Sequence, residues 1–200
     1  MKKTTEPATL EGYYCRQARR ARHDASNAGV QVISPSATVD CEAGERSLLL
    51  NLAVPLRLIR AALPGMIERG DGAIVNIASM ASLAPTPGMI YYNASKGGIA
   101  GASEALRAEL TPHGVSVLTV YPGIIADTDM AASGLAAYDT TAMMRAQPKG
   151  TAKELARRIG RALDRDRARL IYPRMNALAR WFPGTTRWVV DRFTPRLAAG

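Results

Sequence analysis

Apolar positions change their spacing several times along the chain, and each change predicts a different element. From Ser47 to the segment "PGMIERGDG", long apolar runs predict a buried helix, which the Gly and Asp residues of that segment end. "AIVNIAS" (73–79) is short, β-branched and almost wholly apolar, as expected for a strand covered on both faces. "VSVLTVY" (115–121) predicts a second buried strand for the same reason.

A helix is expected between these two strands. After the Pro- and Gly-rich loop "MASLAPTPGM", apolar residues recur at helical spacing from Asn93 to Leu110, and "TPHG" closes the helix. Strand, helix and strand in this order favour parallel strands joined by crossover helices. We therefore expect an α/β fold with functional groups at the carboxyl ends of the strands.

The patterns at the two ends of the chain are weaker. Residues 1 to about 46 are polar and weakly periodic, and "RQARRARHDAS" shows nothing like a strand. Near the other end, Thr151 as N-cap and Glu154 at N3 form a capping box that opens a helix toward Leu163. "RLIYP" predicts a last short strand, and "MNALARWFPGTTRWVVDRF" predicts two short amphipathic pieces divided by its Pro-Gly pair.

Composition indicates an ordinary soluble domain, because 47% of the 200 residues are apolar and 22% are charged. The opening "MKKTTEPATLEGYY" lacks the hydrophobic run of a signal peptide, so we expect a cytoplasmic protein. Asn51, Arg57 and Arg60 interrupt the most apolar segment, which argues against a membrane span. The two cysteines have no CxxC spacing and the two histidines lie far from them, so neither a metal site nor a disulfide is expected.

"YYNASKGG" (91–98) holds a candidate for acid/base chemistry. Tyr92 stands four residues before Lys96, which places both on one face of a helix, whereas Tyr91 stands five before it. A phenol has a pKa near 10, and an ammonium about 6 Å away would favour phenolate by roughly 3 kcal/mol at an effective dielectric near 20. Tyr92 is therefore the expected proton carrier. Taken alone, the motif also fits an exposed Tyr/Lys pair without chemistry.

Further motifs accompany the Tyr/Lys pair at fixed separations. Ser79 lies 13 residues before Tyr92, and Asn51 lies 28 residues before Ser79. "SNAGV" (26–30) precedes them and "YPGIIADTDM" (121–130) follows. In this order and spacing, from about residue 26 to about 175, the chain resembles the short-chain dehydrogenase/reductase family.

The resemblance implies catalytic roles for four residues. Tyr92 would exchange a proton with the substrate oxygen, and Lys96 would lower the pKa of Tyr92 and hydrogen-bond the nicotinamide ribose. Ser79 would donate a hydrogen bond to the substrate oxygen, where charge develops. Asn51 would hold a water that links Lys96 to solvent. The lack of an N–H on Pro55 supports this role independently, because it predicts a distorted helix beside Asn51, the alternative being an irregular first turn.

The resemblance also implies a cofactor, NAD or NADP, with the preference left open. The residues expected to bind it are Asn27, Ala28, Gly29, Tyr92, Lys96, Pro122, Gly123, Ile125 and Thr128. The substrate would be a small carbonyl or alcohol compound. The helices that carry Asn51 and Lys96 commonly form a dimer interface in the family, so a homo-oligomer is expected.

The chain departs from the family pattern in two ways. Residues 1–25 contain no glycine-rich turn TGxxxGxG, which binds the cofactor pyrophosphate in the family, and Thr128 stands six residues after Pro122 rather than five. We therefore expect a Rossmann-like doubly wound parallel sheet that is incomplete, with its first βαβ units missing. The expected divisions are an atypical segment (1–25), a catalytic core (26–175) and a basic aromatic extension or lid (176–200). Two functions remain: an active NAD(P)(H)-dependent oxidoreductase, or an inactive homologue that acts as a binding or partner subunit.

Positive charge is concentrated near the end of the chain. Residues 145–200 hold 14 Lys/Arg against 4 Asp/Glu, a balance of +10, while residues 51–144 hold 5 against 7. Trp and Phe residues mingle with the arginines there. Three interpretations remain: a lid over a substrate cleft, which is favoured, a peripheral contact with a membrane, and nucleic-acid binding, which is least favoured. A lipid-like substrate would agree with the first two.

Overall fold

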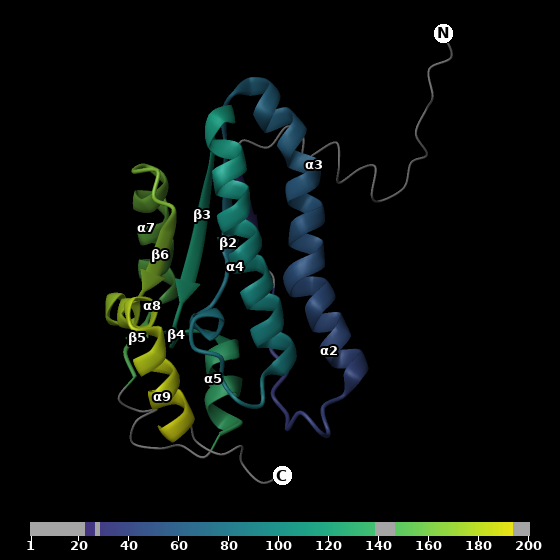
Figure 1. Ribbon diagram of the computed structural model, residues 1–200, viewed down its shortest axis with the longest axis vertical. Helices are drawn as coiled ribbons and strands as arrows, with labels where there is room; N and C mark the ends of the chain where they lie inside the picture. Colours follow the sequence, from purple (N-terminus) through teal and green to yellow (C-terminus); the bar gives the residue numbers. More distant parts are fainter. Residues whose placement is uncertain (1–22, 27–28, 139–146, 194–200) are drawn as a thin grey trace.

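A parallel sheet of four strands, in the order β1-β2-β3-β6, lies at the centre of the fold (Figure 1). The computed structural model describes residues 23–26, 29–138 and 147–193 of the 200. The strands are β1 (His23–Ser26), β2 (Gly72–Ile77), β3 (Val115–Pro122), β4 (Ile124–Ile125), β5 (Lys149–Gly150) and β6 (Arg169–Tyr172). The helices are α2 (Cys41–Leu48), α3 (Val54–Arg69), α4 (Ile90–Leu110), α5 (Asp129–Ala136), α7 (Ala152–Leu163), α8 (Leu178–Trp181) and α9 (Pro183–Phe193). A π-helical segment, η1 (Leu49–Ala53), joins α2 to α3, and short 3₁₀ turns are η2 (Met80–Ser82), η3 (Thr111–His113) and η4 (Arg174–Ala177).

Helices cover both faces of the sheet. On one face α3 and α4 pack on alternate strand residues, in a cluster of Ile59, Ala62, Met66, Ile74, Leu110, Val115 and Val117. On the other face α7 packs on the intervening residues, in a cluster of Val75, Leu118, Val120 and Ala162. Because successive strand side chains point to opposite faces, this arrangement requires the nearly continuous apolar strands seen in the sequence. The α/β class and the doubly wound parallel sheet are confirmed.

The two central strands and the helix between them match the sequence prediction, with shifted helix starts. The helix expected from Ser47 begins at Cys41, because the side chain of Asp40 accepts hydrogen bonds from the N–H groups of Glu42 and Ala43. The helical run ends at Arg69, where Gly70 takes φ of 64°. The second helix begins at Ile90 rather than Asn93.

The first described strand corrects the sequence analysis, which found no strand in "RQARRARHDAS". His23–Ser26, the last four residues of that segment, form β1 and pair in parallel with β2, with Ala25 opposite Val75. The segment has no apolar alternation that could have indicated a strand. Its extended conformation depends on the hydrogen bonds to β2, and this tertiary pairing outweighs local preference.

The last third of the chain follows its predicted elements in part. Thr151 caps α7 as expected, since its hydroxyl accepts from the N–H of Glu154 at 3.3 Å. The second contact of the predicted capping box, from the N–H of Thr151 to the Glu154 side chain, is wrong. Glu154 binds Arg157 and Arg158 instead, and the N–H of Thr151 donates to the Tyr172 hydroxyl at 3.2 Å. "RLIYP" forms β6 beside β3, as predicted. The Pro-Gly pair opens α9 instead of lying between two helices.

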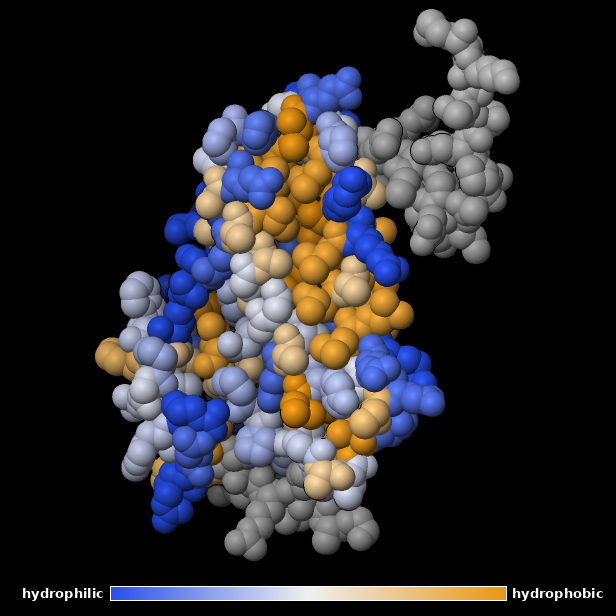
Figure 2. All heavy atoms as spheres, turned by 45° about the vertical axis from the view of Figure 1, so that its right-hand side comes forward, coloured by the Kyte–Doolittle hydropathy of each residue, from blue (hydrophilic) through white to orange (hydrophobic). Residues whose placement is uncertain are grey.

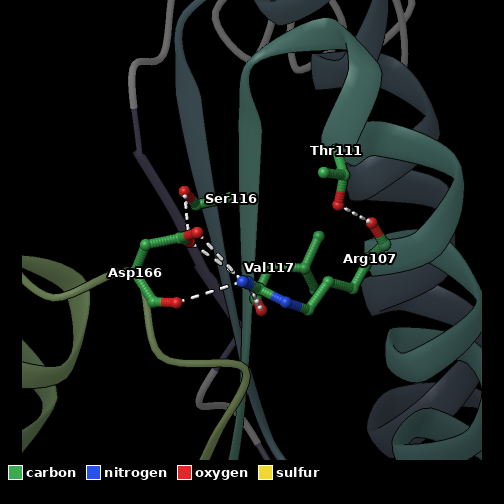
Figure 3. Close-up of polar contacts among 5 residues, drawn as sticks. All are labelled: Arg107, Thr111, Ser116, Val117 and Asp166. Carbon is green, nitrogen blue, oxygen red and sulfur yellow. Dashed lines mark hydrogen bonds and ion pairs between the residues drawn. The ribbon is translucent and has the colours of Figure 1, made fainter.

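A polar cluster joins the turn before β6 to α4 and β3 (Figure 3). The Arg107 guanidinium binds both carboxylate oxygens of Asp166, at 3.0 and 3.2 Å, and donates to the Val117 carbonyl at 3.0 Å. The Ser116 hydroxyl donates to Asp166 Oδ1 at 2.8 Å. The Arg107 and Ser116 hydrogen bonds hold the pKa of Asp166 below its ordinary value. The cluster also fixes Asp166 at φ of 44°, a conformation that Asp tolerates better than most residues.

The helical run Cys41–Arg69 carries apolar residues on its exposed side as well as on its buried side. By length and composition alone it could cross a membrane. In this fold it is a core helix, since Ile59, Ala62 and Met66 pack against the sheet. Figure 2 shows apolar side chains gathered along the side of the molecule formed by α3 and α4. Exposed large apolar residues on these elements and on η1 include Leu49, Ile67 and Ile90.

Candidate active site

A cavity of about 990 Å³ opens at the carboxyl ends of β2 and β3. Eight of the residues predicted to form the site line it: Gly29, Ser79, Tyr92, Lys96, Pro122, Gly123, Ile125 and Thr128. Asn51 lies behind this wall and is not among the lining residues, and Asn27 and Ala28 fall outside the described residues. The fold therefore brings together side chains from four separate segments of the sequence.

The structure separates the two adjacent tyrosines. Tyr92 is only 7% exposed, lines the cavity, and its hydroxyl lies 4.0 Å from the Met130 sulfur. Tyr91 packs instead against α2, where a Cβ at Gly44 would clash with its ring. Of this pair, Tyr92 lines the cavity and Tyr91 does not.

Lys96 is a buried cation in the wall of the cavity. Its Nζ donates to the carbonyl of Ile77, the last residue of β2, at 2.8 Å, and lies 5.8 Å from the centre of the Tyr92 ring. Burial lowers the pKa of Lys96 to about 8. Two of its three N–H donors are left for other groups, such as the hydroxyls of a bound ribose.

The pKa of Tyr92 moves in the opposite direction from the sequence expectation. Burial raises the pKa of this phenol above its ordinary value, and a hydrogen bond with the Ser79 side chain opposes the rise. The expected lowering by Lys96 does not dominate, because the phenol is nearly excluded from water and the ammonium is itself desolvated. Tyr92 is therefore a neutral phenol near neutral pH, a form suited to giving a proton.

Ser79 follows directly after β2 in extended backbone and caps the turn η2. Its Oγ accepts from the N–H of Ala81 at 3.1 Å. Because a hydroxyl also carries one donor, this contact leaves the Ser79 O–H able to donate toward Tyr92 or a bound oxygen. The turn thus holds the hydroxyl at the cavity wall.

Asn51 lies in the π-helical segment, so the helix distortion predicted from Pro55 is present beside it. The N–H of Val54 donates to the Leu49 carbonyl across this segment. The Asn51 side chain is 2% exposed, and its Nδ2 also lies within hydrogen-bond distance of the hydroxyls of Ser47 (3.2 Å) and Ser95 (3.3 Å). Such π-helical segments occur often at functional sites.

Gly29 brings the loop after β1 close to two of the catalytic candidates. A Cβ at this position would lie 3.2 Å from Asn51 Oδ1 and 3.6 Å from Lys96 Nζ. A side chain there would therefore crowd Asn51 and stand in van der Waals contact with Lys96. Glycine allows the backbone to approach Lys96 closely, which explains its place in the "SNAGV" motif.

The segment after β3 lines the far wall. Gly123 donates its N–H to the Tyr172 carbonyl at 2.7 Å, and the side chain of Asn176 fills the space where a Cβ at Gly123 would stand. The Thr128 hydroxyl donates to the Ile125 carbonyl at 2.8 Å and accepts from the N–H of Ala131, so it caps α5. The Thr128 hydroxyl thus uses its one hydrogen for the Ile125 carbonyl and has none to donate to a cofactor.

Several lining residues were not predicted. They are mostly apolar and include Gln31, Met89, Met130, Tyr138, Met175, Asn176, Val189, Val190 and Phe193. Burial raises the pKa of Tyr138 to about 12, and its hydroxyl donates to the Pro87 carbonyl at 2.8 Å, so it is a wall residue rather than a base. The α9 residues Thr186, Val189, Val190 and Phe193 recur at helical spacing, a signal present in the sequence. One face of α9 therefore walls the cavity, although its aromatic residues Trp188 and Phe193 are exposed.

Comparison with known proteins gives relatives for the part of the chain that forms the site. The model of the short chain dehydrogenase family matches residues 25–139. The inactive 2-(S)-hydroxypropyl-CoM dehydrogenase 2 of Xanthobacter autotrophicus is 37% identical over 105 residues, which are 52% of this chain and 46% of that protein. The D-beta-hydroxybutyrate dehydrogenase of Rhizobium meliloti is 35% identical over 100 residues, 50% of this chain and 39% of that protein. The chain thus matches less than half the length of each of these relatives.

Solved structures agree over most of this chain. A short-chain dehydrogenase from Sphingobium yanoikuyae in complex with NADPH superimposes with a TM-score of 0.72 at 26% identity, covering 95% of this chain and 73% of that one. A short chain dehydrogenase from Burkholderia cenocepacia in complex with NADP gives a TM-score of 0.75 at 27% identity, covering 95% and 77%. Together with the family match over more than half of the residues, this similarity shows that the chain belongs to the short-chain dehydrogenase/reductase family.

Proposed function

We propose that this protein is an NAD(P)(H)-dependent oxidoreductase that interconverts a ketone or aldehyde and an alcohol, with Tyr92 as its acid/base. One observation carries the proposal: Ser79, Tyr92 and Lys96 line a single, mostly apolar cavity at the carboxyl ends of the central strands. Family membership supports it, and so do the NADPH and NADP bound in two structural relatives. Ligands of open α/β sheets bind at this edge of the sheet.

The cavity wall fits the nicotinamide half of such a cofactor. Gly29 leaves backbone, not side chain, beside Lys96, and the two remaining N–H donors of Lys96 can bind ribose hydroxyls. Pro122 and Gly123 line the opposite wall, where the side chain of Asn176 occupies the space beside Gly123. When bound there, the nicotinamide supplies or accepts a hydride.

The protein's own groups would handle the proton. In reduction the carbonyl carbon gains the hydride, the C–O π electrons move to oxygen, and that oxygen takes the phenolic proton of Tyr92. Oxidation of the alcohol reverses each step. The Ser79 O–H would donate to the same oxygen and stabilise its developing negative charge. The raised pKa keeps Tyr92 protonated near neutral pH, in the form that holds a proton to give.

Lys96 and Asn51 would return a proton to Tyr92. Lys96 lies 5.8 Å from the Tyr92 ring, and its pKa of about 8 lets it lose and regain a proton near neutral pH. A Cβ at Gly29 would approach both Asn51 and Lys96, so the two groups border the same small space. We place in that space the water of the relay that the family resemblance implies.

Titration of the purified chain with NADPH and with NADH tests the proposal without knowledge of the substrate. We expect saturable binding of at least one cofactor, measured by calorimetry, and competition by the corresponding oxidised form. Absence of saturable binding at roughly millimolar cofactor, above the usual range of such affinities, would overturn the enzymatic function for this chain.

A second candidate function is a binding or partner subunit without turnover. It is favoured because one relative carries the name "Inactive" and because the match spans less than half of that relative. The two functions differ in a measurable way: a partner subunit needs neither cofactor binding nor the Tyr92 hydroxyl.

We also propose that the chain forms a homo-oligomer through the apolar side formed by α3 and α4 (Figure 2). Leu49 and Ile67 are 48% and 38% exposed there. On α4, a Cβ at Gly97 or Gly101 would meet no atom within 4 Å, so both glycines leave open surface that a neighbouring helix could approach.

A further inference from the structure

All the tryptophan and phenylalanine of the chain lies at its basic end. The 200 residues contain two Trp and two Phe, and these are Trp181, Phe182, Trp188 and Phe193. All four are exposed, by 75%, 59%, 63% and 46% respectively. Large aromatic residues normally supply core or interface area. Exposure of every Trp and Phe side chain therefore indicates a surface that another molecule covers.

Neighbouring aliphatic residues extend this surface. Met175 is 70% exposed and Leu178 is 61% exposed. We call the six residues together the tail surface: Met175, Leu178, Trp181, Phe182, Trp188 and Phe193. They make up six of the ten exposed large hydrophobic residues in the described part of the chain. They lie on η4, α8 and α9, with Phe182 between the two helices, on the opposite side of the molecule from α3 (Figure 1).

Two residues of the tail surface border the cavity. Met175 and Phe193 both line the cavity and are largely exposed. On α9, Val189 and Val190 line the cavity, whereas Trp188 is not among its lining residues and faces solvent. The helix thus has an inner apolar face toward the cavity and an outer face that carries Trp188.

Positive charge accompanies these apolar residues. Within the described residues 147–193 there are 12 Lys/Arg against 4 Asp/Glu, a balance of +8. Some arginines are used inside the fold: Arg180 binds Glu104 of α4, and Arg187 binds Asp191. Arg174 and Arg192 are exposed at the edges of the tail surface, and the Arg192 guanidinium lies 5.5 Å from the centre of the Phe193 ring.

We propose that the tail surface docks the protein on an anionic lipid bilayer, as a peripheral contact that does not span it. Tryptophan and phenylalanine beside arginine form the side-chain set of an interfacial anchor, in which rings enter the headgroup region and guanidinium groups meet lipid phosphate. Anchoring of Arg180 to Glu104 fixes α8 so that its apolar residues lie outward before binding.

The positive charge of the tail surface favours a bilayer over a second copy of the chain or a nucleic acid as its binding partner. A second copy would bring the same arginines to the contact, so like charges would oppose pairing through this surface. Nucleic acid would satisfy the arginines but would leave aliphatic Met175 and Leu178 in water. An anionic bilayer can take up the arginines together with the exposed aromatic and aliphatic side chains. If the proposed oxidoreductase function also holds, an apolar substrate dissolved in the bilayer would enter the cavity mouth without crossing water.

Intrinsic fluorescence tests the docking directly, because Trp181 and Trp188 are the two tryptophans of the chain. The full chain is titrated with phosphatidylcholine vesicles and with vesicles that also contain phosphatidylglycerol. We expect a blue shift of the emission and cosedimentation with the anionic vesicles, both reduced by added salt. No blue shift with anionic vesicles, or equal binding to the neutral ones, would contradict the proposal. Because neither assay needs cofactor or substrate, a failure here is separate from a failure of catalysis.

Paired variants locate the contact. Arg174→Gln with Arg192→Gln should weaken anionic-vesicle binding on the order of tenfold or more, and Leu178→Ser with Phe182→Ser should do the same while both tryptophans remain as reporters. The matched control joins an exposed arginine of α3 and an exposed apolar residue of the loop after β1, as Arg60→Gln with Val30→Ser, and should bind as the parent does. Equal losses in test and control variants would overturn the assignment of this surface. A blue shift of the emission that grows with protein concentration in the absence of vesicles would also overturn it. In that case a second copy of the chain would bury the tail surface.

Discussion

Asn51 and Val30 exchange two hydrogen bonds across the fold. The N–H of Val30 donates to Asn51 Oδ1 at 2.9 Å, and Asn51 Nδ2 donates to the Val30 carbonyl at 2.8 Å. The pair ties the π-helical segment to the loop that begins at Gly29. Asn51 therefore has a structural task in addition to any part in a proton relay, since it holds the backbone that approaches Lys96.

Asn51→Leu should lower the free energy of unfolding by about 2–3 kcal/mol, because it leaves the N–H and carbonyl of Val30 without their partner. Urea denaturation measures the loss. Ser47→Ala is the control: it removes one neighbour of Asn51 Nδ2 and keeps both bonds to Val30, so it should cost about 1 kcal/mol or less. Equal losses in the two variants would show that the Val30 pairing contributes little.

Lys96→Met should make the protein more stable near neutral pH, by roughly 2 kcal/mol once the lost bond to Ile77 is subtracted. Burial lowers the pKa of Lys96 from 10.5 to about 8, so between these values the unfolded chain binds more protons than the folded one. Stability of the parent therefore rises with pH across this window. The advantage of the variant should shrink as pH rises from about 8 to about 10.5.

Denaturation of parent and variant at several pH values checks this prediction. Lys153→Met is the matched control, because Lys153 is exposed on α7. Its effect on stability should not change across the same pH window. A Lys96→Met advantage that stays constant with pH would mean that the ammonium is not desolvated in the folded state.

Asp166→Asn should cost about 0.5–1 kcal/mol near neutral pH, since the carboxylate binds Arg107 but its side chain is 62% exposed (Figure 3). Asn tolerates the positive φ at this position, so the substitution tests the charge rather than the backbone. The folded pKa of Asp166 is lowered, so its contribution is present above the ordinary value of 3.8 and is lost as pH falls through the folded pKa. Parent and variant should converge in acid, whereas Asp164→Asn, at an exposed site nearby, should change little at either pH. A difference that persists in acid would exclude the ion pair as its cause.

Gly101→Arg should reduce oligomer mass without loss of folding. A Cβ at Gly101 meets nothing within 4 Å, and replacing a helical glycine removes a conformational cost of about 0.5–1 kcal/mol. Light scattering after size exclusion gives the mass, and Gly160→Arg on α7, where a Cβ also meets nothing, is the control. Unchanged mass in both variants would show that the contact does not involve α4 or that the chain is a monomer.

The sequence predicted the parts of the fold in which local pattern and burial agree. β2, β3 and the helix between them have apolar residues at the positions that the sheet buries, and Thr151 is a cap by its own chemistry. β1 could not be predicted, because its strand conformation depends on pairing with β2, a contact that leaves no periodicity in four residues. Helix starts were placed late for a similar reason: the Asp40 cap lies outside the apolar run.

The candidate site divides in the same way. Helical spacing selected Tyr92 over Tyr91 as the partner of Lys96, and the family resemblance added Ser79, which follows a strand end; all three line the cavity. The direction of the Tyr92 pKa was wrong, since pairwise charge was considered without the burial that the fold imposes. The role of Asn51 in holding Val30 was also missed, because a backbone partner carries no mark in the sequence.

Replacement of the Tyr92 hydroxyl tests the central claim, that this phenol transfers the proton in the cavity. The measurement is the rate of reduction of a panel of ketones by NADPH or NADH, with cofactor affinity measured in parallel, for Tyr92→Phe and for its neighbour Tyr91→Phe. We predict that Tyr92→Phe lowers kcat by about 10²–10⁴-fold with nearly unchanged cofactor Kd, and that Tyr91→Phe keeps the parent rate. Retained turnover in Tyr92→Phe, or a loss of cofactor affinity as large as the loss of rate, would contradict the account.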